Sequence, residues 1–522
     1  MRKYSVVIAF VLSLLLVFSI AHAERTVWYV HPDSTLNSIQ AGLDSCADND
    51  IVLVGPGTYV ENIVWPATQG IDLMSEYVPD TTLIDGNSAD VVISITTGVD
   101  TTTIINGFTI RNGSAYDAGG IYCNGSSPTI SGNTITDNTS TWGGGGIECY
   151  MYSSPTIIGN TITNNTTPYG GGIECVSNSS PNITGNTIDS NTATYGGGIY
   201  CNNSSPTITY NTITGNTATF HGGGIDCWTN SSPTITNNTI TGNESFYAGG
   251  GIGCYGYASP TITGNTIDSN TAVHGGGIAS KIASPTVTDN IITDNAADSL
   301  GGGIGFRQSS PTISHNIIEA NTALCGGGIG CDSSSFGTID SCTISGNNGD
   351  GVYCESASSP EIHWCNITDN TGYGVQNIDP GVMVDAEDNW WGDSTGPGGY
   401  GPGSGDSVSQ WVDYDPWLTD SVEWVGIEEH KPIQPVATIL QINPNPFRAR
   451  VNIRWQTPNN QQAHIAIYDA MGRLVTEYTD VTTNKLIWHG KDGSNRKLPS
   501  GVYFIKFTTE RVNKTRKLLL IR

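Results

Sequence analysis

The sequence predicts an all-β protein in which a long parallel β-helix solenoid precedes a small β-sandwich. One phrase recurs every 25 to 27 residues, with copies that start at Pro128, Pro155, Pro181, Pro206, Pro233 and Pro260. Self-similarity at such a period is the mark of a solenoid. The composition is rich in Gly, Asn, Thr and Ser, with 65 glycines, which suits short strands and tight turns. Alternating strand patterns after residue 438 predict the sandwich.

The charge is divided unevenly along the chain. The net charge is −26, yet residues 438–522 hold 14 Lys and Arg against 5 Asp and Glu, a net of +9, which leaves −35 for the remainder. Two parts so different in charge are expected to be separate domains. Between Asn112 and Gln308 the only basic residues are Lys281 and Arg307. Because phosphate binding needs Lys and Arg, we expect neither nucleic acid nor a polyanionic glycan as a partner of the repeats.

The first 23 residues have the pattern of a secretory signal peptide. Arg2 and Lys3 precede an apolar run over residues 6–20, and Ala21-His22-Ala23 gives a cleavage site of small residues. An uncleaved membrane anchor is the alternative, but the apolar run is short for a span. We therefore expect an exported protein with no transmembrane segment in its mature form.

Residues 24–112 are expected to form an N-terminal cap followed by irregular first turns. Four residues at helical spacing predict a short amphipathic helix: Leu36, Ile39, Leu43 and Cys46. Strand patterns follow over residues 51–54, 59–65 and 91–93. A helix laid across the open end of a solenoid prevents pairing with another sheet edge.

Residues 113–420 predict about three short strands per turn, with three apolar stripes stacked inside. The stripes run from Ile130 to Ile362, from Ile135 to Ile367 and from Ile147 to Ile329. β-branched residues favour strands, and counterparts on successive turns lie roughly 4.8 Å apart. An Asn between the first two stripes predicts a hydrogen-bonded ladder at a corner: Asn133, Asn160, Asn186, Asn211, Asn238, Asn265, Asn290 and Asn316. The Gly-Gly-Gly before each third-stripe Ile predicts another sharp corner.

Cysteines occupy one position of the repeat, two residues after the third-stripe Ile. They predict a stack of buried thiols on the core face: Cys123, Cys149, Cys175, Cys201, Cys227 and Cys254. A single file supplies no tetrahedral ligand set, so we expect no zinc. Cys342 and Cys365 replace the ladder Asn on consecutive turns, which makes this pair the disulfide candidate, with two free thiols as the alternative.

The candidate ligand-binding residues form an outward file beside the glycines. Six ring-bearing residues precede the glycines on successive turns: Trp142, Tyr169, Tyr195, His221, Tyr247 and His274, with Phe220 and Phe246 next to two of them. Glu148, Glu174 and Asp226 lie between the third-stripe Ile and the Cys, and alternation predicts that they point outward. Aromatic faces beside carboxylates favour a groove for neutral sugars. Coverage of the glycine corner, with the acids solvating the surface, is the alternative.

The same acids allow two further hypotheses. Glu148, Glu174 and Asp226 are the candidate catalytic carboxylates if the chain hydrolyses glycosidic bonds. Glu148 and Glu174, one turn apart, also offer two ligands to a calcium ion, which is a thin ligand set. Apart from calcium, the sequence predicts no cofactor.

Parts of the sequence resemble pectin-lyase-like β-helix proteins. The matching stretches are Ser38-Ile39-Gln40-Ala41-Gly42-Leu43, Val54-Gly55-Pro56-Gly57-Thr58-Tyr59 and Ile105-Asn106-Gly107-Phe108-Thr109-Ile110. The resemblance covers roughly residues 36–420 and implies a right-handed parallel β-helix. It does not carry over chemistry, because those lyases use basic surface residues and the repeats are nearly bare of them. The clustered aspartates, His and Arg-x-Lys expected of polygalacturonase-type hydrolases are also missing.

One version of the repeat also resembles that of the polymorphic outer membrane proteins, which are surface adhesins. It reads Thr214-Gly215-Asn216-Thr217-Ala218 followed by Gly222-Gly223-Gly224-Ile225. The departure is Gly-Gly-Gly-Ile where that family usually has Gly-Gly-Ala-Ile. Convergence of two β-helices is the alternative explanation.

The solenoid is expected to end near residue 420. Trp390-Trp391-Gly392 is similar to a phrase that closes many β-helix repeat proteins, so Trp390 and Trp391 are expected to plug the last turn, with a sugar platform as the alternative. A linker is predicted over residues 421–437.

Residues 438–522 resemble the C-terminal sorting domain of type IX secretion cargo. The matching phrases are Asn443-Pro444-Asn445-Pro446-Phe447, Ile467-Tyr468-Asp469-Ala470-Met471-Gly472-Arg473, Pro499-Ser500-Gly501-Val502-Tyr503-Phe504 and Lys517-Leu518-Leu519-Leu520-Ile521-Arg522. The resemblance implies delivery across the outer membrane of a Gram-negative cell by the type IX machinery, followed by release or surface attachment. A plain Ig-like module is the alternative.

These observations predict an exported β-helix protein that binds a neutral polysaccharide or a glycan of another cell's surface. A polysaccharide hydrolase or lyase that uses the outward carboxylates is the competing function, and a mere spacer is the third.

Overall fold

The computed structural model describes residues 25–422, 441–443, 447–454, 463–469, 473–481, 485–508 and 513–521. The predicted signal peptide and nearly all of the predicted linker lie outside these residues. The described chain is almost entirely β, with one short α-helix and one 3₁₀ turn.

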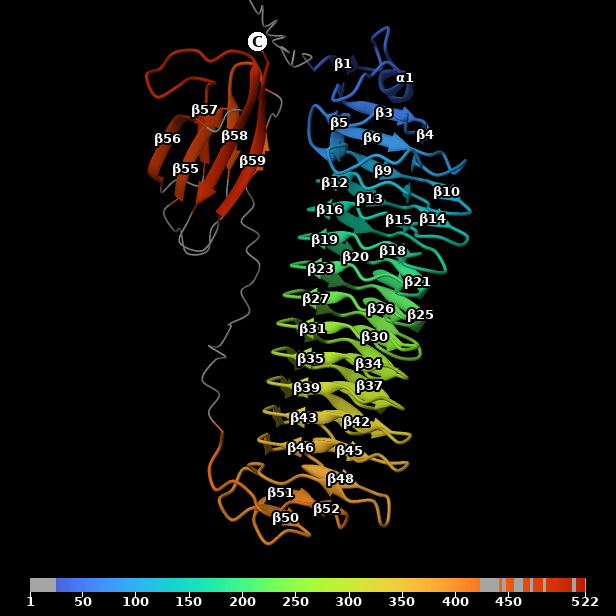
Figure 1. The fold of residues 1–522 in the computed structure, drawn as a ribbon, viewed down its shortest axis with the longest axis vertical. Helices are drawn as coiled ribbons and strands as arrows, with labels where there is room; N and C mark the ends of the chain where they lie inside the picture. Colours follow the sequence, from blue (N-terminus) through green and yellow to red (C-terminus); the bar gives the residue numbers. More distant parts are fainter. Residues whose placement is uncertain are drawn as a thin grey trace, which may run out of the picture.

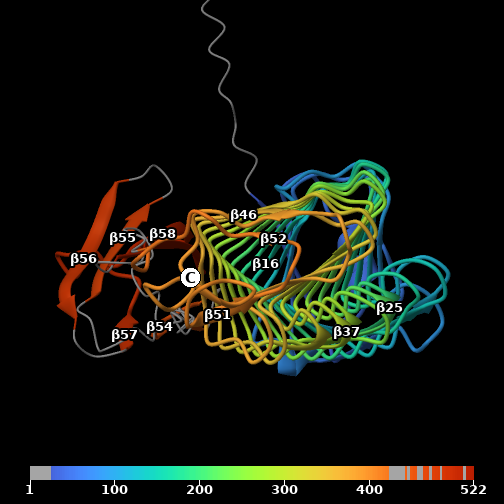
Figure 2. The same cartoon turned by 90° about the horizontal axis from the view of Figure 1, so that it is seen from below.

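Three parallel sheets form the walls of the solenoid, which is the predicted fold (Figure 1). The first has 16 strands, from β1 (Val27–Val30) to β52 (Val412–Asp413). The second has 13, from β3 (Gly57–Val60) to β47 (Asn366–Thr368), and the third has 15, from β4 (Ile63–Val64) to β50 (Pro397–Gly399). One repeat places a strand in each sheet, as in β16 (Thr156–Ile158), β17 (Thr161–Thr163) and β18 (Ile173–Val176). Seen along its axis, the coil is a prism of stacked turns (Figure 2).

A fourth sheet, which the sequence did not predict, lies outside the prism. It has six parallel strands: β21 (Thr192–Tyr195), β25 (Thr217–His221), β29 (Glu244–Ser245), β33 (Thr271–His274), β37 (Ala296–Leu300) and β41 (Thr322–Cys325). The pair β10 (Ser114–Ala115) and β14 (Thr139–Ser140) continues it towards the N-terminus, and single bridges at Thr166 join the two parts. The segment between the second and third sheets therefore bulges outward on each turn, as the cross-section shows (Figure 2).

The three apolar stripes form the core, as predicted. Ile157, Ile162 and Ile173 are fully buried, and each pairs in register with the Ile at the same place one turn later. The six stacked cysteines from Cys123 to Cys254 are likewise fully buried. Since no single turn could bury its own face, stacking supplies the apolar burial that drives folding.

The predicted asparagine ladder runs along the corner between the first and second sheets. Asn186 is typical: its Oδ1 accepts from the backbone N–H and the Nδ2 of Asn160 at 2.9 and 3.0 Å. Its own Nδ2 donates to the Ile157 carbonyl at 2.9 Å and to Asn211 Oδ1 at 3.0 Å. Each amide thus satisfies backbone groups that the strands leave unpaired.

Two further ladders occupy the other corners, and the sequence analysis missed both. A second asparagine ladder follows the second sheet: Asn138, Asn165, Asn191, Asn216, Asn243, Asn270, Asn295, Asn321, Asn347 and Asn370. Serine hydroxyls line the third corner, where each accepts the backbone N–H of the Ser one turn earlier: Ser153, Ser179, Ser204 and Ser231. Every corner of the prism is therefore held by side chains.

Cys342 and Cys365 stand in the first ladder, as the sequence indicated. Both are fully buried free thiols, and the backbone N–H of Cys342 donates to the Sγ of Cys365 at 3.4 Å. The backbone N–H of Cys365 in turn donates to Asn389 Oδ1 at 2.9 Å, so the ladder continues with asparagine. The disulfide between them stays a prediction.

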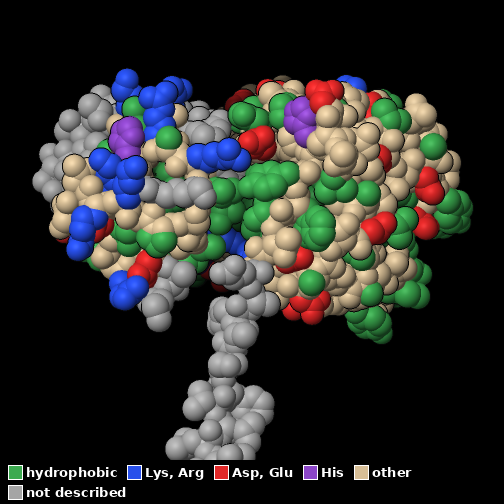
Figure 3. Space-filling view, turned by 90° about the horizontal axis from the view of Figure 1, so that it is seen from above, with side chains coloured by type: hydrophobic (Ala, Val, Ile, Leu, Met, Phe, Trp, Pro, Cys, Tyr) green, Lys and Arg blue, Asp and Glu red, His purple; other side chains and the backbone are tan. Residues whose placement is uncertain are grey.

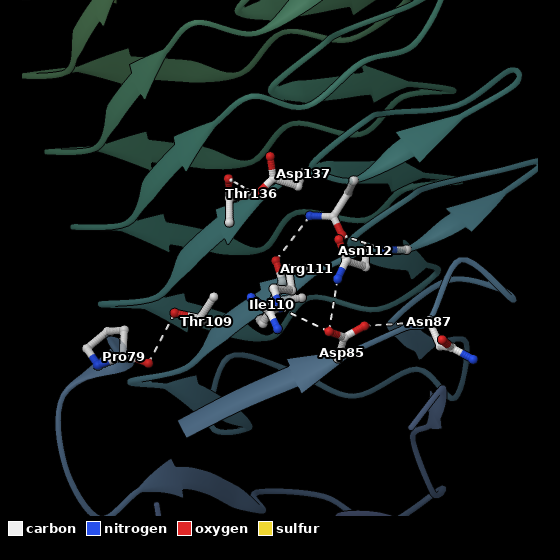
Figure 4. A network of polar contacts seen from close by, with 11 residues as sticks. Pro79, Asp85, Asn87, Thr109, Ile110, Arg111, Asn112, Thr136 and Asp137 are labelled. Carbon is white, nitrogen blue, oxygen red and sulfur yellow. Dashed lines mark hydrogen bonds and ion pairs between the residues drawn. The ribbon is translucent and has the colours of Figure 1, made fainter. Parts of the chain in front are cut away.

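The N-terminal helix α1 (Ile39–Asp44) lies over the first turns, where the sequence predicts it (Figure 1). Ile39 and Leu43 bury its apolar face, and Glu61 accepts the backbone N–H groups of Ile39 and Gln40 at the helix start. The first turns are joined by a polar network in which Asp85 accepts from Arg111 Nε at 3.0 Å and Asn112 Nδ2 at 2.9 Å (Figure 4).

At the other end, only one of the two tryptophans plugs the core. Trp391 is fully buried in it, whereas Trp390 is half-buried and uses its backbone carbonyl to accept from Ile367 N–H at 2.8 Å. The second ladder ends on Asp406, which accepts from Asn370 Nδ2 at 2.9 Å.

The C-terminal region forms two small antiparallel sheets around its own core. One contains β53 (Gln441–Asn443), β54 (Val451–Arg454) and β57 (Lys485–Trp488). The other contains β55 (Ala463–Asp469), β56 (Leu474–Val481), β58 (Gly501–Thr508) and β59 (Asn513–Leu520). Phe447, Trp488 and Ile505 are buried between them, which agrees with the predicted small β domain. Lys and Arg gather on this domain, as the sequence indicated (Figure 3).

No helix in the described part of the chain is both long and apolar enough to cross a membrane.

A ladder deletion should show how much each corner amide contributes. We expect Asn186→Ala to lower the free energy of unfolding by about 2–4 kcal/mol, because it orphans the buried Asn160 N–H and the Ile157 carbonyl. Asn182→Ala is the matched control, since Asn182 is exposed on β19 (Asn182–Thr184) only four positions away. Denaturant unfolding of both variants measures the difference, and equal losses would refute the role given to the ladder.

Candidate functional site

The predicted aromatic file exists and follows the fourth sheet. Its members stack or meet edge to edge on seven successive turns, with ring centroids 5.1–6.4 Å apart: Tyr116, Trp142, Tyr169, Tyr195, Phe220, Tyr247 and His274. Tyr169 and Tyr195 are nearly parallel and stacked, with 7° between their ring planes, so each partly covers a face of the other. Trp142 meets Tyr169 at 64° and is 56% exposed, and Tyr116 and Phe220 are also exposed. The open ring faces therefore lie mainly at the N-terminal end of the file.

His221 does not belong to the outer file. It is 5% exposed and stacks on Tyr255 with ring centroids 3.8 Å apart, while its neighbour Phe220 takes the place in the file. Successive residues of β25 point to opposite sides of the strand, so only one of the two rings can face outward.

The expectation that the acids lie on the surface is wrong. Glu148 and Glu174 are each 5% exposed, and Asp226 is fully buried. Their side chains do leave the outer face of the third sheet, in register with Tyr122 and Tyr200. The fourth sheet, however, packs over that face and covers them. We call this layer between the third and fourth sheets the seam.

A glycine at each inner edge of the fourth sheet makes the seam tight. Gly170 has a φ of 62°, and a Cβ there would collide with the Ile173 carbonyl oxygen. The chain can therefore turn straight from the fourth sheet into β18, which brings the two sheets together above Glu174. The Gly-Gly-Gly motif thus determines the burial of the acids.

The seam holds most of the unpaired polar atoms of the structure. Of the nine buried side-chain polar atoms without a hydrogen-bond partner in the described residues, seven lie here: Glu148 Oε2, Glu174 Oε2, both carboxyl oxygens of Asp226, His221 Nδ1, Tyr255 OH and His274 Nδ1. Burying such groups unpaired is costly when they are charged, so the neutral forms are favoured.

The pKa values follow this burial. Burial, followed by the charge of Asp117, raises the pKa of Glu148 to about 8. Burial also raises the pKa of Glu174, with Glu148 as the next cause, and that of Asp226. Burial and then Lys281 lower the pKa of His221 to about 3, and burial and then Arg307 lower the pKa of His274. At neutral pH the seam is therefore largely uncharged.

Sequence reasoning missed three rings of this region. Tyr116 extends the file by one turn, and it lies 26 residues before Trp142, so the period alone could have found it. Trp228 and Tyr255 pack against His221 from the third sheet. They lie two residues after Asp226 and Gly253, on the same face of their strands, which is the signal that could have found them.

The seam does not assemble a metal site. No group of three or more His, Cys, Asp or Glu side chains in the described ranges could hold a metal ion. Glu148 and Glu174 stack one turn apart, but their two carboxyl groups offer a calcium ion at most four of the six to eight oxygens it takes.

The buried acids should make stability depend on pH. Because the folded-state pKa of Glu148 is raised from 4.5 to about 8, its stabilising contribution is complete below pH 4.5 and is lost as the pH rises through 8. We expect the free energy of unfolding to fall by a few kcal/mol over that window, on the order of one for each unit of pKa shift.

Glu148→Gln should reduce this fall, because an amide has no proton to lose. Glu244→Gln should leave it unchanged, since Glu244 is exposed on β29. Denaturant midpoints between pH 4 and 9 provide the measurement, and a flat wild-type profile would contradict the burial of the acids.

Comparison with known proteins identifies both parts of the chain. The model of the right-handed β-helix region matches residues 84–240 and 250–390, and that of the secretion system C-terminal sorting domain matches residues 441–521. No curated protein sequence matches the chain. These matches confirm the predicted β-helix and the predicted sorting domain.

Two solved structures show weaker likeness. One is PorZ, an essential bacterial surface component of the type-IX secretion system of Porphyromonas gingivalis, at 21% identity over 17% of this chain and 12% of PorZ, with a TM-score of 0.15. The other is a tailspike protein mutant of E. coli bacteriophage HK620 in complex with a pentasaccharide, at 11% identity over 92% of this chain and 88% of that chain, with a TM-score of 0.23.

Neither likeness is close enough to carry an argument about function. The sorting domain indicates secretion or display at the cell surface by the type IX machinery. The chain belongs to the right-handed β-helix family and ends in a type IX secretion sorting domain.

Proposed function

We propose that the protein is a secreted or surface-attached β-helix that binds a neutral glycan along the aromatic file. The observation that carries the proposal is the file itself, which continues through seven turns on one side of the solenoid. Aromatic rings offer sugars apolar faces for their C–H groups, and Tyr hydroxyls offer hydrogen bonds.

The exposure of the rings supports this function. Tyr116 is 65% and Trp142 56% exposed, and Phe246, the neighbour of Tyr247 in the chain, is 56% exposed. Water contact of large rings is unfavourable, and a row of them on one side is a common sign of an interaction surface. Tyr169 and Tyr195 stack closely on each other, whereas Trp142 keeps more than half of its surface exposed.

The charge of the site supports a neutral ligand. The acids beneath the file are buried and favour their protonated forms, so they present no carboxylate to solvent. Few basic residues are available along the repeats, and the acidic solenoid repels polyanions.

A polysaccharide hydrolase is the second candidate, and one observation favours it. Glu148 and Glu174 form a carboxyl pair on adjacent turns, and the raised pKa of Glu148 is what a general acid needs. Their burial counts against it, because a general acid must reach the glycosidic oxygen. Catalysis would require the fourth sheet to move away from the third near Gly143 and Gly170.

Binding should depend on the exposed tryptophan. We expect Trp142→Ala to weaken glycan binding roughly three- to tenfold, because ring stacking contributes on the order of 0.5–1.5 kcal/mol beyond the area it buries. Tyr210→Ala is the matched control, since Tyr210 is 68% exposed but lies at the corner between the first and second sheets. A glycan array followed by calorimetry on the bound sugar measures both variants, and equal affinities would exclude the file.

The products of incubation separate the two candidates. A glycan that is retained without new reducing ends or unsaturated sugars is the expected result. Turnover that disappears in Glu148→Gln or Glu174→Gln, while Glu244→Gln keeps it, would replace binding with hydrolysis as the function.

A further inference from the structure

The two basic residues of the repeats lie together at the C-terminal end of the aromatic file. Lys281 ends β34 (Ile278–Lys281) and Arg307 ends β38 (Ile304–Arg307), and the two pair in register on adjacent turns of the third sheet. Tyr255 precedes Lys281 in the same column, and Asp332 follows Arg307. The column therefore passes from aromatic to basic to acidic within four turns.

The two cations differ in their partners. Arg307 Nε lies 2.7 Å from Asp332 Oδ2, and this carboxylate is nearly buried. Lys281 is exposed and makes no ion pair within the part of the chain that the structure describes. An exposed, unpaired ammonium is free to bind an anionic group at little desolvation cost, whereas Arg307 already has its charge compensated.

Lys281 lies one turn after Tyr255 in the same column of the third sheet, and Tyr255 stacks on His221. Burial is the main cause that lowers the pKa of both His221 and His274, and the charge of Lys281 adds to it, after that of Arg307 in the case of His274. His274 closes the aromatic file against Tyr247, and its Nδ1 is buried without a partner among the described residues. The end of the file thus combines a cation with imidazole and phenol rings.

We propose that Lys281, the exposed and unpaired cation at this end of the file, is a subsite for a single carboxylate of the bound glycan. The ligand of the file is then a largely neutral chain that carries one carboxylated sugar at this end. This inference rests on the proposed function. A polyanion is disfavoured, because the negative charge of the solenoid repels it along its whole length. A single carboxylate contacts Lys281 directly, at a distance where salt screens the attraction little.

The test compares paired glycans on the full-length protein. The probes are neutral oligosaccharides and the same chains with one uronate unit, presented on an array and then titrated by calorimetry. The wild type should prefer the uronate form by about tenfold, which is typical of one charge-assisted contact, and the preference should shrink in high salt.

Substitution assigns the preference to Lys281. Lys281→Gln should bring the uronate form down to the affinity of the neutral form, and Lys281→Arg should keep most of the preference. Lys506→Gln is the control, because Lys506 is exposed on β58 of the C-terminal domain and should change neither affinity.

The outcomes of these experiments distinguish the carboxylate subsite from the proposed glycan-binding function. The subsite is overturned if the wild type binds the two forms equally, or if the preference survives Lys281→Gln. The glycan function still stands in that case, provided that Trp142→Ala weakens the binding. If no probe binds at all, both the function and the subsite are overturned.

Discussion

The hydrogen-bond ladders at the corners are the constraint on which the rest of the structure depends. A strand pairs its backbone with the turns above and below, but a corner exposes N–H and C=O groups to an apolar interior, where they are costly if unpaired. Each ladder Asn satisfies groups on its own turn and the adjacent one, as Asn186 does between Asn160 and Asn211. The amide works only if its neighbour carries one too. Each repeat therefore needs an Asn at the same position as the repeats before and after it.

Departures from the ladder show what it tolerates. Cys342 and Cys365 continue it with sulfur acceptors, which are weaker, and Asn389 restores it on the next turn. Asp406 closes the second ladder with a carboxylate that accepts but does not donate, which is what a last turn needs. In the serine ladder, Ala283 has no hydroxyl, and Ser280, which stands in the cysteine column, bonds to Ser309 in its place. Polar satisfaction can thus move between columns while the backbone stays the same.

Sequence reasoning succeeded where the position of a residue type depends on a local pattern alone. Ile130 and its counterparts, Asn133 and its counterparts, Cys123 and the helix at Ile39 all follow from periodicity or capping, and all lie where expected. It failed where burial depends on a segment packing back over the coil. The alternation correctly sends Glu148 and Glu174 away from the core, but nothing in β15 (Ile147–Tyr150) or β18 reveals the fourth sheet above them. The second ladder at Asn138 was within reach, since it repeats with the same period.

The same geometry decides where function can lie. Ladders and stripes hold the three walls of the prism, and the bulge between the second corner and the Gly-Gly-Gly motif carries the aromatic file. Gly170 and its counterparts pull that bulge down onto the third sheet, which hides the acids and leaves rings such as Trp142 outside. As the chain is built, the seam is largely uncharged and the outer face carries exposed rings, and these two features are the basis of our proposal of binding without turnover.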